Sequence, residues 1–218
     1  MEDLLKQIAE FIEIGKSDIN SPFPPELKGT VGAYELTRKA LDINIHPEVI
    51  LKDAFMVGMT NIGDKFEQGT AFIPNLLLAA KAMNRSMELL QPFFDSGEAK
   101  LRGTLVIGTV KGDLHDIGKN IVKMVMKGDG WNVIDLGVKV ESDQFLNEIK
   151  NHKQCIVGLS ALLTTTMINM EEIIKDIKNE YDGTKVFVGG AALSNRFAEK
   201  IGADGYFADP HSFAKHFH

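Results

Sequence analysis

A histidine and a carboxylate two residues apart are the pair in this sequence best suited to chemistry. Asp113 and His115 lie in the loop 112–118, which directly follows the apolar run 105–110. A short apolar run before a polar loop is typical of a buried strand, and open α/β sheets bind ligands at the carboxyl ends of their strands. A carboxylate that orients the ring of a histidine also supports that histidine as a metal ligand. The pair therefore predicts a ligand site at a strand end.

Two further loops follow predicted strands. The segment 160–166 supplies serine and threonine hydroxyls, and the segment 189–190 is a pair of glycines that lets a backbone approach a ligand closely. Each has an ordinary structural explanation, namely helix capping for the hydroxyls and a tight turn for the glycines. Because parallel strands end at one edge of a sheet, we expect the three loops to form one pocket.

The second half of the chain alternates short β-branched runs with helical stretches, which is typical of a parallel doubly wound sheet. The expected strands are 105–110, 132–136, 155–159, 185–188 and 206–208. The expected helices are 117–127, 142–150, 167–180, 195–201 and 212–216. No Gly-x-Gly-x-x-Gly follows the first strand, so a dinucleotide site is not supported.

The first half has apolar residues at helical spacing and predicts a small four-helix bundle. The expected helices cover residues 4–12, about 29–41, 47–66 with a stop at Gly69, and 74–91 with Pro92 as the end. We therefore expect a helical cap domain over residues 1–95, a polar linker over 96–103 and an α/β domain over 104–218.

Composition narrows the function classes. The 218-residue chain has a net charge of −6 and no basic stripe, so no nucleic-acid partner is expected. No apolar run reaches the length of about 20 residues that spans a bilayer, and no signal peptide is visible, which predicts no membrane partner and a cytoplasmic protein. The single cysteine, Cys155, excludes an intrachain disulfide and any multi-cysteine metal site.

Three short motifs follow one another along the chain in a specific order. Asp113-x-His115-x-x-Gly118, then Ser160-x-Leu162, then Gly189-Gly190 resembles the three-part signature of vitamin-B12-binding domains. The resemblance implies a flavodoxin-like, five-stranded Rossmann-like domain that binds cobalamin, or a related corrinoid, in the base-off form. It implies that His115 replaces the cofactor's own benzimidazole as the axial ligand of cobalt. It also implies a catalytic relay of His115, Asp113 and Thr166.

The same resemblance implies the remaining contacts to the corrinoid. They are Gly112, Leu114, Asp116 and Gly118 in the loop around the ligand, Ser160, Leu162 and Thr164 near the nucleotide tail, Gly189 and Gly190 along its wall, and the backbone of Ala208.

The helical half carries a second resemblance. Gly58-Met59-x-x-Ile62-Gly63-Asp64-x-Phe66 and Phe72-Ile73-Pro74 are similar to the helical cap that precedes the B12 domain in methionine synthase and in corrinoid methyl carriers. In that family a bulky apolar pair covers the upper face of cobalt. The matching residues are Phe66 and Ile73. Both could be bundle core, but their place next to the connection 67–71 favours the cap.

The resemblance implies a methyl carrier that alternates between Co(I) and methyl-Co(III). It would take a methyl group from a substrate-specific methyltransferase, whose donor could be a methylamine, methanol, a methoxyaromatic or a betaine. It would deliver that group to a second methyltransferase acting on tetrahydrofolate or a thiol coenzyme, and a reductive activase for Co(II) would return oxidised cobalt to Co(I). The chain would not be catalytically complete alone, because one cysteine cannot build a thiol-activating zinc site.

Two alternatives stay open. A B12-dependent regulatory sensor shares the cap and the B12 domain but needs a DNA-binding module, and no basic helix-turn-helix segment is visible here. The B12 subunit of an adenosylcobalamin mutase shares the loop of His115 but not usually this cap.

Overall fold

The computed structural model describes residues 2–218, which form two compact units. The first comprises residues up to Leu101 together with Lys127–Gly130, and the second comprises Arg102–Met126 and Trp131–His218. No helix within residues 2–218 is long and apolar enough to cross a membrane.

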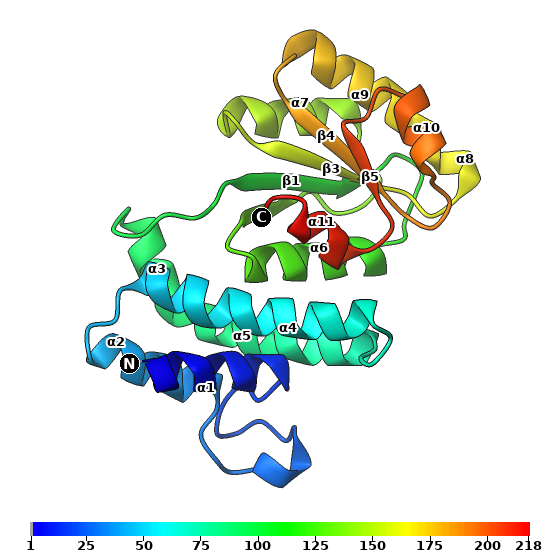
Figure 1. Ribbon diagram of the computed structural model, residues 1–218. Coiled ribbons are helices and arrows are strands. Elements are labelled where there is room, and N and C mark those ends of the chain that lie inside the picture. The colour runs from blue at the N-terminus through cyan, green and yellow to red at the C-terminus, as the bar shows by residue number, and fades with distance from the viewer. Residues whose placement is uncertain (1) are drawn as a thin grey trace. The chain divides into compact units, whose positions relative to one another are not determined.

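The first unit is a bundle of four helical segments (Figure 1). They are α1 (Glu2–Glu13), α2 (Ala33–Asp42), the continuous stretch formed by α3 (Pro47–Ile50), the π-helical turn η2 (Leu51–Phe55) and α4 (Met56–Glu67), and α5 (Ile73–Asp95); a short 3₁₀ turn, η1 (Pro25–Leu27), precedes α2. In α1 the buried face follows the helical period through Leu4, Ile8 and Ile12. The expected four-helix bundle is confirmed.

The second helix begins later than the sequence predicts. Gly29 has a φ of 80°, a left-handed conformation that cannot continue into a helix, and α2 starts at Ala33. The backbone N–H of Gly32 donates to Glu35 Oε2 over 2.7 Å and so closes the first turn. Glu35 is therefore the residue that marks the start of α2 in the sequence.

Pro92 does not end the fourth helix as predicted. It lies inside the last turn of α5, which continues to Asp95. The carbonyl of Pro92 accepts a hydrogen bond from the Ser96 N–H over 3.1 Å, so the proline costs one N–H donor without breaking the turn that follows it. Gly97, with a φ of 78°, follows the end of the helix.

The second unit contains one parallel five-stranded sheet. Its strands are β1 (Thr104–Thr109), β2 (Asn132–Asp135), β3 (Ile156–Ser160), β4 (Lys185–Gly189) and β5 (Gly205–Phe207). Their spatial order is β2-β1-β3-β4-β5, and every neighbouring pair is parallel. This is the flavodoxin-like order, with its switch point between β1 and β3. The expected fold class is confirmed.

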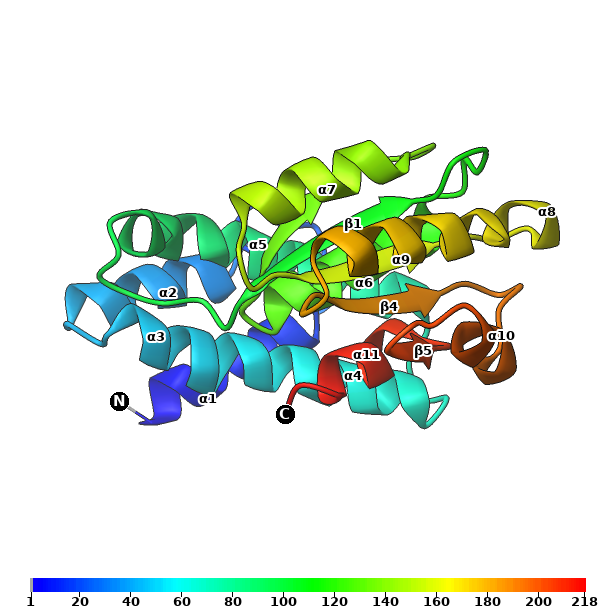
Figure 2. The same cartoon turned by 90° about the horizontal axis from the view of Figure 1, so that it is seen from above.

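Helices cover both faces of this sheet, as the views in Figures 1 and 2 show. They are α6 (Ile117–Gly128), α7 (Ser142–Asn151), α8 (Thr164–Met167), α9 (Asn169–Glu180), α10 (Asn195–Lys200) and α11 (Pro210–Lys215). Helices α7 and α9 lie on one face, and α6 and α11 lie on the other (Figure 1). The expected helix 167–180 is present as two segments, α8 and α9.

The face beneath α7 and α9 is closely packed. The register places Val106, Val157 and Val186 in one row across β1, β3 and β4, and all three are fully buried. They join one continuous apolar core with the buried sides of both helices, including Phe145 and Ile177.

The opposite face is built by the alternate residues, because successive side chains of a strand point to opposite sides. One row reads Asp135, Ile107, Gly158, Phe187 and Gly205, and the next reads Thr109, Ser160, Gly189 and Phe207. Glycine or serine therefore occupies three of the four positions on β3 and β4, which leaves the middle of this face hollow.

Candidate metal-cofactor site

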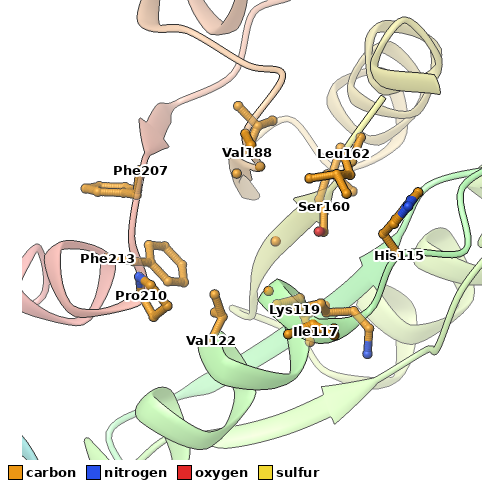
Figure 3. Close-up of a pocket in the computed structure, with 18 of the residues that line it drawn as sticks. His115, Ile117, Lys119, Val122, Ser160, Leu162, Val188, Phe207, Pro210 and Phe213 are labelled. Carbon is orange, nitrogen blue, oxygen red and sulfur yellow. The ribbon is translucent and has the colours of Figure 1, made fainter. Parts of the chain in front are cut away.

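A cavity of about 520 Å³ lies over this hollow face, and we call it the trough. The strand residues that line it are Ile107, Gly158, Leu159, Ser160, Phe187, Val188, Gly189 and Phe207, and α6 and α11 contribute Ile117, Gly118, Lys119, Val122, Pro210 and Phe213. Figure 3 shows His115 at one side and Phe207, Phe213 and Pro210 at the other. A cavity of this size at the carboxyl ends of parallel strands is suited to a cofactor.

Two glycines keep the trough open for different reasons. Gly190 has a φ of 134°, and a Cβ on it would lie 1.8 Å from the carbonyl oxygen of Ala161, so no other residue fits there. A Cβ on Gly118 would meet no atom within 4 Å. The packing of the chain itself therefore does not require a glycine at 118, and the space beside it belongs to the trough.

His115 is held by Asp113 through two contacts to one carboxylate oxygen. Its backbone N–H donates to Asp113 Oδ1 over 3.0 Å, and its ring Nδ1 lies 2.7 Å from the same oxygen. The Asp113 side chain is fully buried, whereas half of the His115 side chain is exposed. The loop thus fixes the ring while leaving its outer edge open.

The second carboxylate oxygen ties Asp113 to the loop after β3. Asp113 Oδ2 accepts the Thr166 hydroxyl over 2.6 Å and the Leu162 backbone N–H over 2.9 Å. Burial opposes ionisation, but the bonds from Thr166 and from the backbone N–H groups of His115 and Leu162 outweigh it and hold the pKa of Asp113 well below its usual range. Asp113 is therefore a carboxylate at neutral pH.

An ionised Asp113 determines which nitrogen of His115 carries the proton. The proton belongs on Nδ1, where it can be donated to the carboxylate, and the lone pair belongs on Nε2. Among residues 2–218, no group is hydrogen-bonded to Nε2. Because His115 lines the trough, the site presents an oriented imidazole whose Nε2 is open to a ligand, and an imidazole held in this way is suited to bind a metal.

Nine of the residues expected to contact a cofactor do line the trough. They are Leu114, His115, Asp116, Gly118, Ser160, Leu162, Gly189, Gly190 and Ala208. Asp113 and Thr166 are buried and do not line the trough; Asp113 contacts the His115 ring, and Thr166 bonds to Asp113. Gly112, with a φ of 81°, packs beside Thr166 and shapes the loop. Thr164 is exposed at the start of α8 and does not line the trough.

The two expected cap residues lie in the helical unit on either side of the connection 68–72. Phe66 is half-buried near the end of α4, and Ile73, at the start of α5, is 45% exposed. Gly69 has a φ of 72° directly after α4, so the expected stop is present. The cover that this pair would provide stays a prediction.

Sequence reasoning missed the inner lining of the trough. Ile107, Val122, Gly158, Phe187, Phe207, Pro210 and Phe213 all line it. One signal was available, since a glycine inside a strand, such as Gly158, marks a place where something approaches the backbone closely. The aromatic residues carried no local signal, because their meeting depends on the strand order.

The rim of the trough fits a large apolar cofactor. Leu114, Ile117 and Leu162 line it and are 62%, 73% and 41% exposed, and exposed apolar side chains gathered in this way mark a binding surface. A free imidazole nitrogen lies among them. Together the fold and the site define a flavodoxin-like domain for a cofactor with an axially ligated metal, and a corrinoid meets each of these requirements.

Comparison with known proteins gives the family. Two models described as a B12 binding domain match residues 103–212 and 30–91. Trimethylamine corrinoid protein 1 of Methanosarcina acetivorans is 42% identical over 178 residues, covering 80% of this chain and 82% of that protein. Dimethylamine corrinoid protein 1 of Methanosarcina mazei is 35% identical, covering 94% and 90%.

Solved structures agree. A cobalamin-binding protein from Desulfitobacterium hafniense superposes with a TM-score of 0.73 at 28% identity, covering 97% of this chain and 95% of that one. The methanol:cobalamin methyltransferase complex MtaBC from Methanosarcina barkeri superposes with a TM-score of 0.80 at 29% identity, covering 98% and 77%. The chain belongs to the family of corrinoid proteins with a B12 binding domain.

Proposed function

We propose that this chain is the methyl-carrying corrinoid protein of a methyltransferase system. The observation that carries the proposal is the hydrogen-bonded series from Thr166 through Asp113 to His115, which leaves Nε2 free at the trough. When bound, the corrinoid would supply a cobalt ion able to carry the methyl group between two methyltransferases. His115 would hold the cobalt through Nε2, and the residues that line the trough would hold the cofactor's nucleotide.

The three relay residues have separable roles. His115 is the ligand. Asp113 holds the proton on Nδ1 and so orients the ring, and Thr166 and the Leu162 N–H hold Asp113 in place. Because Asp113 engages Nδ1, Nε2 is the ring nitrogen of His115 that would hold a metal.

The partners follow from the same proposal. The similarity to a trimethylamine and a dimethylamine corrinoid protein favours a methylated amine as the donor, delivered by its own methyltransferase. An acceptor methyltransferase and a reductive activase complete the cycle. Phe66 and Ile73 would shield the upper face of the cofactor between these encounters.

A methylation assay tests the proposal. The reduced, corrinoid-loaded protein is mixed with trimethylamine, dimethylamine or methanol and the matching methyltransferase, and the visible spectrum is followed. We expect the methylated spectrum to form with an amine donor. Productive binding of adenosylcobalamin alone, as in a mutase subunit, or a light-driven change of oligomeric state, as in a sensor, would contradict the carrier role.

Histidine variants give a matched control. His115→Ala removes the ligand, whereas His152→Ala removes a partly exposed histidine that pairs with Glu148 at 3.5 Å, away from the trough. The first should slow methylation of the loaded protein severely, and the second should leave the rate unchanged.

A further inference from the structure

Thr109, the last residue of β1, places a hydroxyl in a fully buried position. A buried hydroxyl costs free energy unless it is hydrogen-bonded. Ile107 and Ser160, its neighbours on the same face of the sheet, line the trough, whereas Thr109 does not. The Thr109 hydroxyl instead donates to the backbone carbonyl of His115 over 3.0 Å. The polar residue at this strand end therefore serves the loop that carries His115.

The sheet fixes Thr109 from both sides. The backbone N–H of Thr109 donates to the Gly137 carbonyl over 3.0 Å, and its carbonyl accepts the Val140 N–H over 2.9 Å. On the other side Thr109 lies in register with Ser160 of β3. Groups that a strand carries keep their position more precisely than groups on a loop. The hydroxyl of Thr109 is therefore a fixed point to which the backbone of His115 is bound.

Three of the four polar groups of His115 are held by neighbouring residues. The backbone N–H and the ring Nδ1 contact Asp113 Oδ1, and the carbonyl accepts the Thr109 hydroxyl. No other hydrogen bond reaches that carbonyl within residues 2–218. The Asp113 contacts orient the ring, and the Thr109 contact fixes the backbone from which the ring projects. The fourth group, Nε2, is thereby left open to a ligand.

We propose that Thr109 is a positioning residue whose hydroxyl holds the backbone of His115 so that Nε2 stays available to a metal at the trough. The inference rests on the proposed function, in which His115 is the axial ligand. Without the hydroxyl, the His115 carbonyl loses its hydrogen-bond donor, and the residue is held through Asp113 alone. Thr109 does not line the trough, so it acts only through His115. Its removal should weaken ligation by His115 and leave the other contacts to the cofactor in place.

Three variants of β1 measure the contribution of the hydroxyl to binding. The apoprotein is titrated with cobalamin, and the change in the visible spectrum gives the dissociation constant. Thr109→Val removes the hydroxyl at nearly constant volume and should weaken binding about three- to ten-fold, the range for one lost hydrogen bond. Thr109→Ser keeps the hydroxyl and should bind like wild type. Thr104→Val makes the same change at the other end of the strand, away from the trough, and should also bind like wild type.

The His115→Ala background separates positioning from a general structural role. If Thr109 acts through the histidine ring, Thr109→Val should change the affinity of the His115→Ala protein by less than about two-fold, because no ligand remains to be positioned. The same loss in both backgrounds would show that the hydroxyl stabilises the loop as a whole, and would overturn the inference.

Electron paramagnetic resonance gives a second readout that does not depend on affinity. At saturating Co(II) cobalamin, a smaller share of Thr109→Val than of Thr104→Val should show splitting from a histidine nitrogen, and circular dichroism verifies that both variants fold. A wild-type share in Thr109→Val would overturn the inference while leaving His115 as the ligand. Wild-type protein that binds no cobalamin, or that shows no histidine splitting, would instead overturn the proposed function, and the inference with it.

Discussion

Alternate residues of the same strands build two faces of the sheet with opposite contents. Beneath α7 and α9, the row of Val106, Val157 and Val186 is completely buried in a continuous apolar core. Toward α6 and α11, Gly158 and Gly189 occupy the corresponding middle positions, and a cavity of about 520 Å³ lies over them. The first face therefore stabilises the fold by burying side chains, whereas the glycines of the second leave open space beside Ile107, Phe187 and Phe207. The contrast indicates that a binding site can be recognised by what the strands leave unfilled.

The largest effect should come from filling the tightest point of the hollow face. Gly190→Val puts a Cβ within 1.8 Å of the Ala161 carbonyl and forces a φ of 134° on a branched residue. We expect the free energy of unfolding to fall by more than about 4 kcal/mol, measured by chemical denaturation. The same change at Gly183, which has open space and no positive φ, should cost little. A stable Gly190→Val protein would contradict the close approach of these two loops.

A cavity made in the filled face should lower the stability of the protein without changing its affinity for the cofactor. Ile177→Ala removes a fully buried side chain of the core beneath α9. It should destabilise the protein by about 3 kcal/mol in denaturant melts. Cobalamin affinity, measured at a temperature where the variant is folded, should stay at the wild-type value. A large loss of affinity would show that the two faces are not independent.

The charged edge of the hollow face gives a pH test. Asp135 lies in the same row as Ile107 and binds Lys119 and Lys123, the latter at 2.6 Å. Burial opposes its ionisation, but the two lysines and the backbone N–H of Gly137 prevail and lower the pKa of Asp135 from 3.8 to about 2. The lowered folded-state pKa stabilises the protein above about pH 4, and this contribution is lost as the pH falls toward 2.

Asp135→Asn should therefore lower the free energy of unfolding by about 2 kcal/mol at pH 7. The difference from wild type should shrink as the pH falls from 4 to 2. The control is Asp143→Asn, at an exposed carboxylate, which should change the curve little. A difference that is constant with pH would contradict the assigned ion pairs.

The smallest change in the free energy of unfolding is expected for a substitution at Gly118, which should nevertheless weaken cofactor binding clearly. Gly118 lies in the first turn of α6 with nothing within 4 Å of a Cβ. Gly118→Leu should leave the free energy of unfolding unchanged or raise it by up to about 1 kcal/mol, because glycine is a poor helix former. Cobalamin should bind at least about ten-fold more weakly, because the new side chain enters the trough. Gly183→Leu is the matched glycine change outside the trough, and unchanged cobalamin binding by Gly118→Leu would contradict the location of the site.

The helices and strands were predicted correctly where the local hydrophobic patterns of the sequence were strong. The β-branched runs predicted all five strands to within about two residues, because a buried parallel strand reads as a short apolar run. The start of α2 was wrong because Gly29 resembles a permissive helix residue until its positive φ is known. The end of α5 was wrong because a proline in the last turn removes only one N–H donor.

The candidate site was predictable only in part. Asp113 and His115 are two residues apart, so their contact could be anticipated from the loop itself, and the motif suggested Thr166. The loops at the carboxyl ends of the strands could be grouped because the strands were expected to be parallel. The sequence could not predict the contact of Phe187, Phe207 and Phe213. Each is an ordinary apolar residue of its own element, and they meet only through the packing of α11 against β4 and β5.

The most direct test of the account is the axial ligand itself. The protein is loaded with the Co(II) form of cobalamin, and its electron paramagnetic resonance spectrum is recorded for wild type, for His115→Ala and for the His152→Ala control. If His115 is the axial ligand, wild type and control should show nitrogen splitting that changes when the protein's histidine is labelled with the heavy nitrogen isotope. This splitting should disappear in His115→Ala. If the splitting survives in His115→Ala, or does not change with the isotope label, the cofactor's own base remains on cobalt. That result would contradict the assignment of His115 as the axial ligand.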